Sequence, residues 1–154
     1  MTLYHYTSWE HLRSILEDGE IKLTRSNLLK PVAPHLENGN FVDATDYYKP
    51  VVWLSSVLDF KKATGMGLAG GLFDKTEVAI AIQTPPMQQF FKWDRWAEKN
   101  GIETGWFEAL KQTAPLWPTF YVTESPVKID DNTTGIIFRP DIMAQLEQAG
   151  AIDE

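Results

Sequence analysis

Hydrophobic residues are arranged in two ways along the chain, in short apolar or alternating stretches and in stretches with helical spacing. The short stretches predict β-strands, because side chains of a strand point alternately to its two faces. The predicted strands cover Leu3–Thr7, Glu20–Thr24, Val51–Ser56, Lys75–Ile82, Thr119–Glu124 and Gly135–Phe138. The strand at Lys75–Ile82 is closed by Pro85 and Pro86, which disfavour further pairing.

Stretches with apolar residues three and four positions apart predict helices. The first helix follows the first strand, with Thr7 and Glu10 spaced as a capping box and Gly19 as its stop. The predicted helices cover Trp9–Gly19, Leu58–Thr64, Gln88–Lys99, Trp106–Gln112 and a last stretch from Pro140 to Gly150. Strands and helices in this order predict an α+β fold, and 154 residues without a linker predict one domain over 1–154.

The first strand and helix contain the most distinctive residues. His5 lies between Tyr4 and Tyr6 near the end of the strand, directly before a helix N-terminus. Oriented N–H groups at a helix N-terminus favour an anion. A histidine between two tyrosines at such a junction is suited to bind a ribose hydroxyl and a flat ring together. A lone histidine in a strand is usually a structural residue, and that alternative stays open.

Composition excludes several classes of protein. Hydrophobic residues make up 44% and charged residues 23% of the chain, as in globular proteins. With no cysteine, disulfides, thiolate metal sites and cysteine nucleophiles are excluded. No run of eighteen apolar residues and no signal peptide are present, so we expect a cytoplasmic protein without a membrane partner. The net charge of −7 disfavours a broad nucleic-acid groove.

Two loops are candidates for function. Arg25–Pro50 contains prolines, glycine, asparagine and aspartate, and predicts a long irregular loop. Gly65–Gly71 contains the letters of a dinucleotide-binding fingerprint. We reject the fingerprint, because no strand leads into these glycines and a strand rather than a helix follows them.

The chain opens with Tyr4-His5-Tyr6-Thr7-Ser8, continues with a helix that ends at Gly19, and then has Ile21-Lys22-Leu23. This order resembles the opening of the ADP-ribosyltransferase superfamily, and in particular its small prokaryotic and viral members. Val51–Ser56 resembles the second motif of that superfamily, a strand that ends in a hydroxyl residue. Glu124, at the end of a late strand, resembles the third motif, a carboxylate. The resemblance covers about Leu3–Ile129.

The resemblance implies two packed antiparallel β-sheets around a nucleotide cleft, with flanking helices, and NAD as the substrate without a metal. Glu124 would face the ribose during cleavage of the nicotinamide–ribose bond, and His5 would bind the adenosine-side ribose. The implied contacts of the dinucleotide are His5, Tyr6, Thr7, Arg25, Tyr47, Tyr48, Trp53, Ser55 and Ser56. In the superfamily, the hydroxyl of the second motif holds the active-site glutamate.

The implied activity is transfer of ADP-ribose to a protein or nucleic-acid acceptor. Its transition state resembles an oxocarbenium ion, so the site needs groups that hold the ribose and face a positive charge. Glu77 is a rival for the carboxylate, and the chain has no Gln-x-Glu or Glu-x-Glu pair. Two alternatives stay open: a catalytically silent module of the same fold that binds a protein or nucleotide, and an RNA 2′-phosphotransferase using Arg25 and Arg139.

Overall fold

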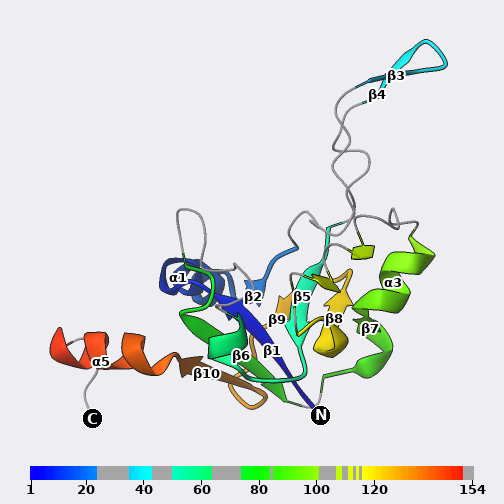
Figure 1. The fold of residues 1–154 in the computed structure, drawn as a ribbon. Helices are drawn as coiled ribbons and strands as arrows, with labels where there is room; N and C mark the ends of the chain where they lie inside the picture. Colours follow the sequence, from blue (N-terminus) through cyan, green and yellow to red (C-terminus); the bar gives the residue numbers. More distant parts are fainter. Residues whose placement is uncertain are drawn as a thin grey trace.

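The computed structural model describes residues 1–23, 35–42, 50–63, 74–83, 85–100, 107–108, 111–112, 114 and 116–150. Its centre is a six-stranded sheet with the strand order β10-β6-β1-β5-β8-β7, in which every pairing is antiparallel (Figure 1). The strands are β1 (Thr2–Thr7), β5 (Val52–Ser55), β6 (Val78–Gln83), β7 (Phe91–Lys92), β8 (Phe120–Thr123) and β10 (Thr134–Phe138). The predicted α+β class is therefore confirmed.

The two halves of this sheet are joined at one position. β1 pairs with β6 through six residues, from Thr2 to Thr7, and β5 pairs with β8 through four. Between β1 and β5 the only residue pair is Tyr4 with Ser55. The large sheet is therefore continuous from β10 to β7, and the pairing between its two halves is limited to this one position.

Helix α1 (Trp9–Asp18) follows β1 as predicted, although its N-cap differs by one residue. Ser8 rather than Thr7 is the N-cap, and its Oγ accepts a hydrogen bond of 3.0 Å from the His11 N–H. Gly19 ends the helix with a φ of 72°, a conformation that glycine adopts without strain. The chain then forms β2 (Glu20–Ile21), which pairs with β9 (Val127–Lys128) in a small second sheet.

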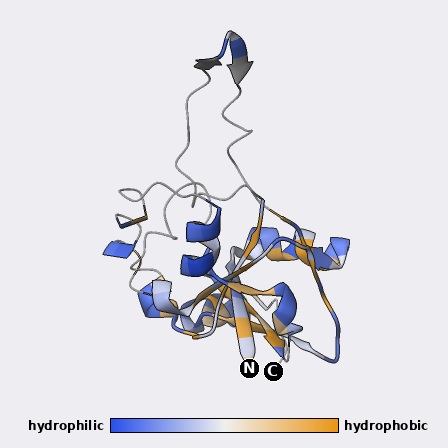
Figure 2. Cartoon of the chain, turned by 90° about the vertical axis from the view of Figure 1, so that its right-hand side faces the viewer, coloured by the Kyte–Doolittle hydropathy of each residue, from blue (hydrophilic) through white to orange (hydrophobic). Residues whose placement is uncertain are grey.

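An aliphatic core fills the space between α1 and one face of the large sheet. Its buried members come from β1, α1, β5 and β6, and they include Leu3, Leu12, Leu54 and Ile80. Leu3 alternates with more polar residues along β1, whereas β6 is apolar and buried on both faces from Val78 to Ile82. Figure 2, seen from the side of α3 and β7, shows mainly hydrophobic colouring on the strands and hydrophilic colouring on the helices.

An aromatic core lies on the other face, where α3 (Trp93–Lys99) packs on β8 and β5. Trp93 is 1% exposed, and its ring contacts Trp53, Phe107, Trp117 and Phe120 at centroid distances of 5.0–6.2 Å. We predicted one helix over Gln88–Lys99. The structure has instead a 3-10 turn at Met87–Gln89, then β7, and then the shorter α3.

Helix α5 (Pro140–Gln148) begins with proline at its first turn, as predicted, and is anchored by Arg139. The Arg139 guanidinium donates to Asp141 at 2.6 and 2.9 Å and to Asp74 at 2.9 Å. These carboxylates raise the pKa of Arg139 above its ordinary value, so its charge is compensated within the fold. Among the described residues, no helix is long and apolar enough to cross a membrane.

Two more elements complete the description. Helix α2 (Phe60–Ala63) is a single turn within the predicted stretch Leu58–Thr64. Strands β3 (His35–Glu37) and β4 (Asn40–Val42) form a hairpin inside the stretch that we predicted to be irregular. Its turn is Asn38-Gly39, with φ of 50° and 78°, which is the sequence that favours a two-residue hairpin turn.

Candidate functional site

The opening between β1 and β5 is the first candidate site. Tyr4 and Ser55 are the one residue pair between β1 and β5. The backbone N–H and C=O groups that follow on the facing edges of these two strands are therefore not part of a ladder between them. His5 is the next residue of β1, and it follows that its side chain and that of Ser55 point to opposite faces of the sheet.

His5 links the two strands across this opening. Its Nδ1 lies 2.8 Å from the carbonyl oxygen of Trp53, and because a carbonyl only accepts, Nδ1 carries the proton. Burial lowers the pKa of His5 below its ordinary value of 6.5, so the ring is neutral at pH 7. Nε2 is then a hydrogen-bond acceptor, and among the described residues it has no partner.

Tyr6 and Ser55 hold the turn that follows β5. The Tyr6 hydroxyl donates to the Val57 carbonyl at 3.1 Å and accepts from the Asp59 N–H at 2.9 Å, while its ring meets Phe60 edge-on. Ser55 Oγ accepts from the Val57 N–H at 3.2 Å. The ring of Tyr6 is thus packed into the fold, and burial raises the pKa of its hydroxyl.

Thr119 lies beside Ser55. The two hydroxyl oxygens are 2.7 Å apart, and the Thr119 hydroxyl donates to the Leu116 carbonyl at 2.7 Å. Ser55 Oγ likewise has a carbonyl to which it donates, that of Val57 at 3.1 Å, so either hydroxyl can be the donor in the contact between the two. Ser55 is 2% exposed, and its position is fixed by these bonds. The resemblance led us to expect a glutamate as the partner of this serine, and the partner is a threonine.

Three further residues of the predicted site lie along the same strands. Trp53 is half-buried, and its carbonyl holds His5 while its ring contacts Trp93 and Phe120. Ser56 is half-buried and bonds through its N–H to the Thr119 carbonyl at 2.9 Å. Thr7 is buried at the end of β1. Arg25, Tyr47 and Tyr48 lie outside the described residues.

Glu124 lies apart from this group. It follows β8, and its Oε1 accepts a hydrogen bond of 3.0 Å from the indole N–H of Trp96 on α3. It lines a groove formed by α3, β7 and β8, and neither His5 nor Ser55 lines that groove. The expectation that His5, Ser55 and Glu124 converge on one pocket is therefore not met, because the β8 register places Glu124 beyond Thr123, opposite the far end of β5.

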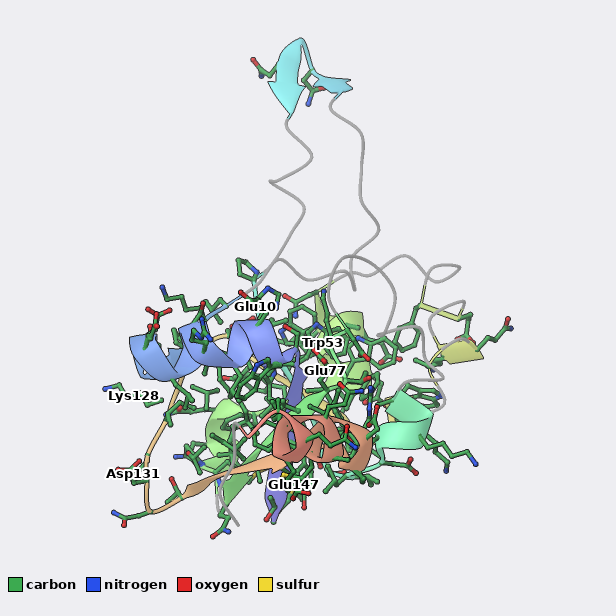
Figure 3. The ribbon with its side chains drawn as sticks, turned by 90° about the vertical axis from the view of Figure 1, so that its left-hand side faces the viewer. Glu10, Trp53, Glu77, Lys128, Asp131 and Glu147 are labelled. Atoms are coloured by element: carbon green, nitrogen blue, oxygen red, sulfur yellow. The ribbon has the colours of Figure 1, made fainter. Side chains whose placement is uncertain are left out.

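Glu77, the rival carboxylate, lies directly before β6 at the end of the sheet where β1 leads into α1. Its Oε1 accepts from the Trp9 N–H at 3.1 Å, which satisfies one of the first backbone donors of α1 (Figure 3). This is a structural role, and a carboxylate is favourable near a helix N-terminus. Among the described residues, no group of three or more His, Asp or Glu side chains is arranged to hold a metal ion.

Sequence reasoning missed Thr119. We placed it at the start of a predicted strand, which is close to the observed β8, but its contact with Ser55 depends on the register between two strands 64 positions apart. No pattern in a single sequence specifies that register. The strand order, which makes β1, β5 and β8 neighbours, was likewise beyond the sequence pattern.

Comparison with known proteins adds no relative: no family model, no curated protein and no solved structure matches this chain.

Proposed function

We propose that this chain is an ADP-ribosyltransferase-like domain that binds NAD in the opening between β1 and β5. The observation that carries the proposal is the neutral His5, held across the opening by Trp53 with Nε2 left as an acceptor. The three strands that resemble the superfamily motifs, β1, β5 and β8, are also neighbours in the sheet.

Three parts of NAD have a matching group in this proposal. His5 Nε2 accepts a hydrogen bond from a hydroxyl of the adenosine-side ribose. Trp53 and Tyr6 are both half-buried and both rings pack in the fold, Trp53 on Trp93 and Phe120, and the exposed part of the Trp53 ring would lie beside the nicotinamide. The carboxamide of nicotinamide has an amide N–H donor and a C=O acceptor, like a peptide group. The backbone C=O and N–H groups of β1 and β5 beyond the Tyr4–Ser55 pair would be the partners of both.

Binding is supported better than transfer of ADP-ribose. Transfer in the resembled superfamily uses a carboxylate held by the serine of the second motif, and in the described part of the chain that serine meets Thr119. Transfer to a protein or nucleic-acid acceptor is the second candidate, favoured by the same strand arrangement. The RNA 2′-phosphotransferase alternative is weakened, because Arg139 is already paired with Asp74 and Asp141.

The test is a thermal melt of the full chain with and without NAD. A ligand that binds only the folded state adds about 2.7 kcal/mol at a concentration of a hundred times its Kd. We expect an upward shift for the wild type and for His11→Ala, whose histidine is exposed on α1. His5→Ala removes one hydrogen bond worth about 1.4 kcal/mol and should weaken NAD binding about tenfold. A wild-type melt that NAD does not move would refute the proposal.

A further inference from the structure

The groove that contains Glu124 is a second candidate site with different chemistry. It has a volume of about 400 Å³ and lies at the edge of the sheet beside α3, β7 and β8. Pockets for small ligands generally have ~300–1,000 Å³. The lining residues are Phe90, Phe91, Lys92, Arg95, Trp96, Lys99, Asn100, Tyr121 and Glu124.

Three cations line this groove in a protein with a net charge of −7. Lys92 is the N-cap of α3, and Arg95 and Lys99 follow it at helical spacing on one face, while Trp93 and Ala97 are buried. Among the described residues, no carboxylate lies within ion-pair distance of any of the three cations. The positive charge therefore remains available to an anionic ligand.

Flat rings accompany the charge. Phe91 is 43% exposed on the edge strand β7, which is uncommon for a phenylalanine in a folded chain. The half-buried ring of Tyr121 lies below the Lys92 ammonium, 5.7 Å from its centroid. Exposed aromatic rings between cations are the arrangement that binds single-stranded nucleic acids, because every base can stack on a ring while its phosphates meet the cations.

Glu124 decides between kinds of anion. A carboxylate inside a cationic groove repels the carboxylate side chains of an acidic peptide, and those side chains offer it no hydrogen-bond donor. A nucleic-acid base with an exocyclic amino group offers a donor that a carboxylate accepts, as Glu does from the N4 amino group of cytosine. The indole N–H of Trp96 fixes one oxygen of Glu124 at 3.0 Å, so the acceptor is held in place.

We propose that this groove binds a single strand of nucleic acid, with its phosphates on Lys92, Arg95 and Lys99, one base on Phe91, and the amino group of a base on Glu124. The site does not involve His5 or the opening between β1 and β5, so the proposal stands independently of NAD binding. The proposed contacts are with phosphates, base rings and base edges. DNA and RNA both have these groups, so the proposal covers both.

The first experiment measures binding of fluorescent ten-residue oligonucleotides to the full chain by anisotropy, at 50 and 200 mM salt. Three phosphate contacts predict a slope of log K against log salt of about −2, which is about a twentyfold loss between the two concentrations. The double variant Arg95→Ala, Lys99→Ala keeps one phosphate contact. Its affinity should be weaker at 50 mM salt and should fall only about threefold between 50 and 200 mM salt.

The matched control is Lys75→Ala, Lys128→Ala, which removes two exposed positive charges outside the groove. We expect it to bind and to depend on salt as the wild type does, and melting temperatures show whether each variant folds. Equal weakening by the two double variants would overturn the proposal, and so would tighter binding of an oligoglutamate peptide than of the oligonucleotides.

The second experiment tests Glu124 by base preference. Wild type should bind oligo(dC) about tenfold more tightly than oligo(dT), whose base has no amino group. We expect the same order for oligo(C) and oligo(U) in the RNA arm. Glu124→Gln removes a negative charge, so binding of oligo(dT) should strengthen while the preference falls to about twofold. An unchanged preference in this variant would overturn the contact between Glu124 and the amino group of a base.

Discussion

The opening between β1 and β5 and the groove beside α3 are built from different kinds of residue. The opening contains a neutral histidine, buried hydroxyls and parted strand edges, all fixed by short hydrogen bonds. The groove contains three cations, an exposed ring and a carboxylate. The first suits the ribose and amide groups of a dinucleotide, and the second suits phosphates and bases. Glu124, which the sequence order assigns to the first region, belongs to the second.

The largest expected effect comes from placing a carboxylate beside Ser55, where the described residues supply the hydroxyl of Thr119. Thr119→Glu places a carboxylate beside the Ser55 hydroxyl, whose oxygen lies 2.7 Å from the hydroxyl oxygen of Thr119. One well-placed electrostatic contact in a transition state contributes about a hundred- to a thousandfold in rate. We therefore expect Thr119→Glu to raise nicotinamide release from NAD by that factor, measured by chromatography in lysate that provides acceptors.

The same assay with Glu124→Gln and Glu77→Gln separates the regions. Glu124→Gln should leave nicotinamide release unchanged, because Glu124 lies in the groove. Glu77→Gln should mainly weaken the start of α1, by about 1 kcal/mol. A large loss of release in Glu124→Gln would return that residue to the mechanism and contradict the separation of the two sites.

A second prediction uses pH. Burial lowers the pKa of His5, so below about pH 6.5 the unfolded chain takes up a proton that the folded chain does not. The free energy of unfolding should fall on acidification from pH 7 toward 5.5, by at most about 1.4 kcal/mol per pH unit for one proton. Urea unfolding of the wild type and of His5→Gln measures this, and the variant should show the shallower dependence.

None of the described residues that line the groove is a histidine, so the oligonucleotide affinity should change little over the same pH range. A wild type and a His5→Gln variant with the same pH dependence would show that His5 is not held neutral by the fold.

The smallest effect concerns the bond between Ser55 and Thr119. Ser55→Ala and Thr119→Val each remove one hydroxyl from a buried pair. Because each single change leaves the other hydroxyl without its partner, the double variant should be about 1 kcal/mol more stable than the sum of the single losses predicts. Urea unfolding of the four proteins gives this coupling, and strict additivity would show that the contact contributes nothing.

Much of the fold followed from the sequence, because its main strands and helices are long enough to have a clear period. The strand around His5, the helix after it and its stop at Gly19 were predicted within a residue or two of their observed ends. The two-residue strands β7 and β9 are too short to have a period. The N-cap was displaced by one residue because Thr7 and Ser8 both suit that position, and only Ser8 bonds to the His11 N–H.

The candidate site was predictable in part. His5 and Trp53 were identified from a short motif, and the structure joins them by a hydrogen bond. Glu124 was assigned from its order along the chain. A shift of a few residues along a strand carries a side chain several ångströms, at ~3.3 Å per residue, so order alone could not separate position 124 from position 119.

The most direct test of the two-site account is an NMR titration that follows the imidazole nitrogens of His5 and the indole N–H of Trp96 in the same sample. We expect NAD to shift the His5 signals and to leave the Trp96 signal in place. Oligo(dC) should do the reverse, because Trp96 lies in the groove and bonds to Glu124. NAD shifts confined to Trp96, with His5 unmoved, would contradict the account.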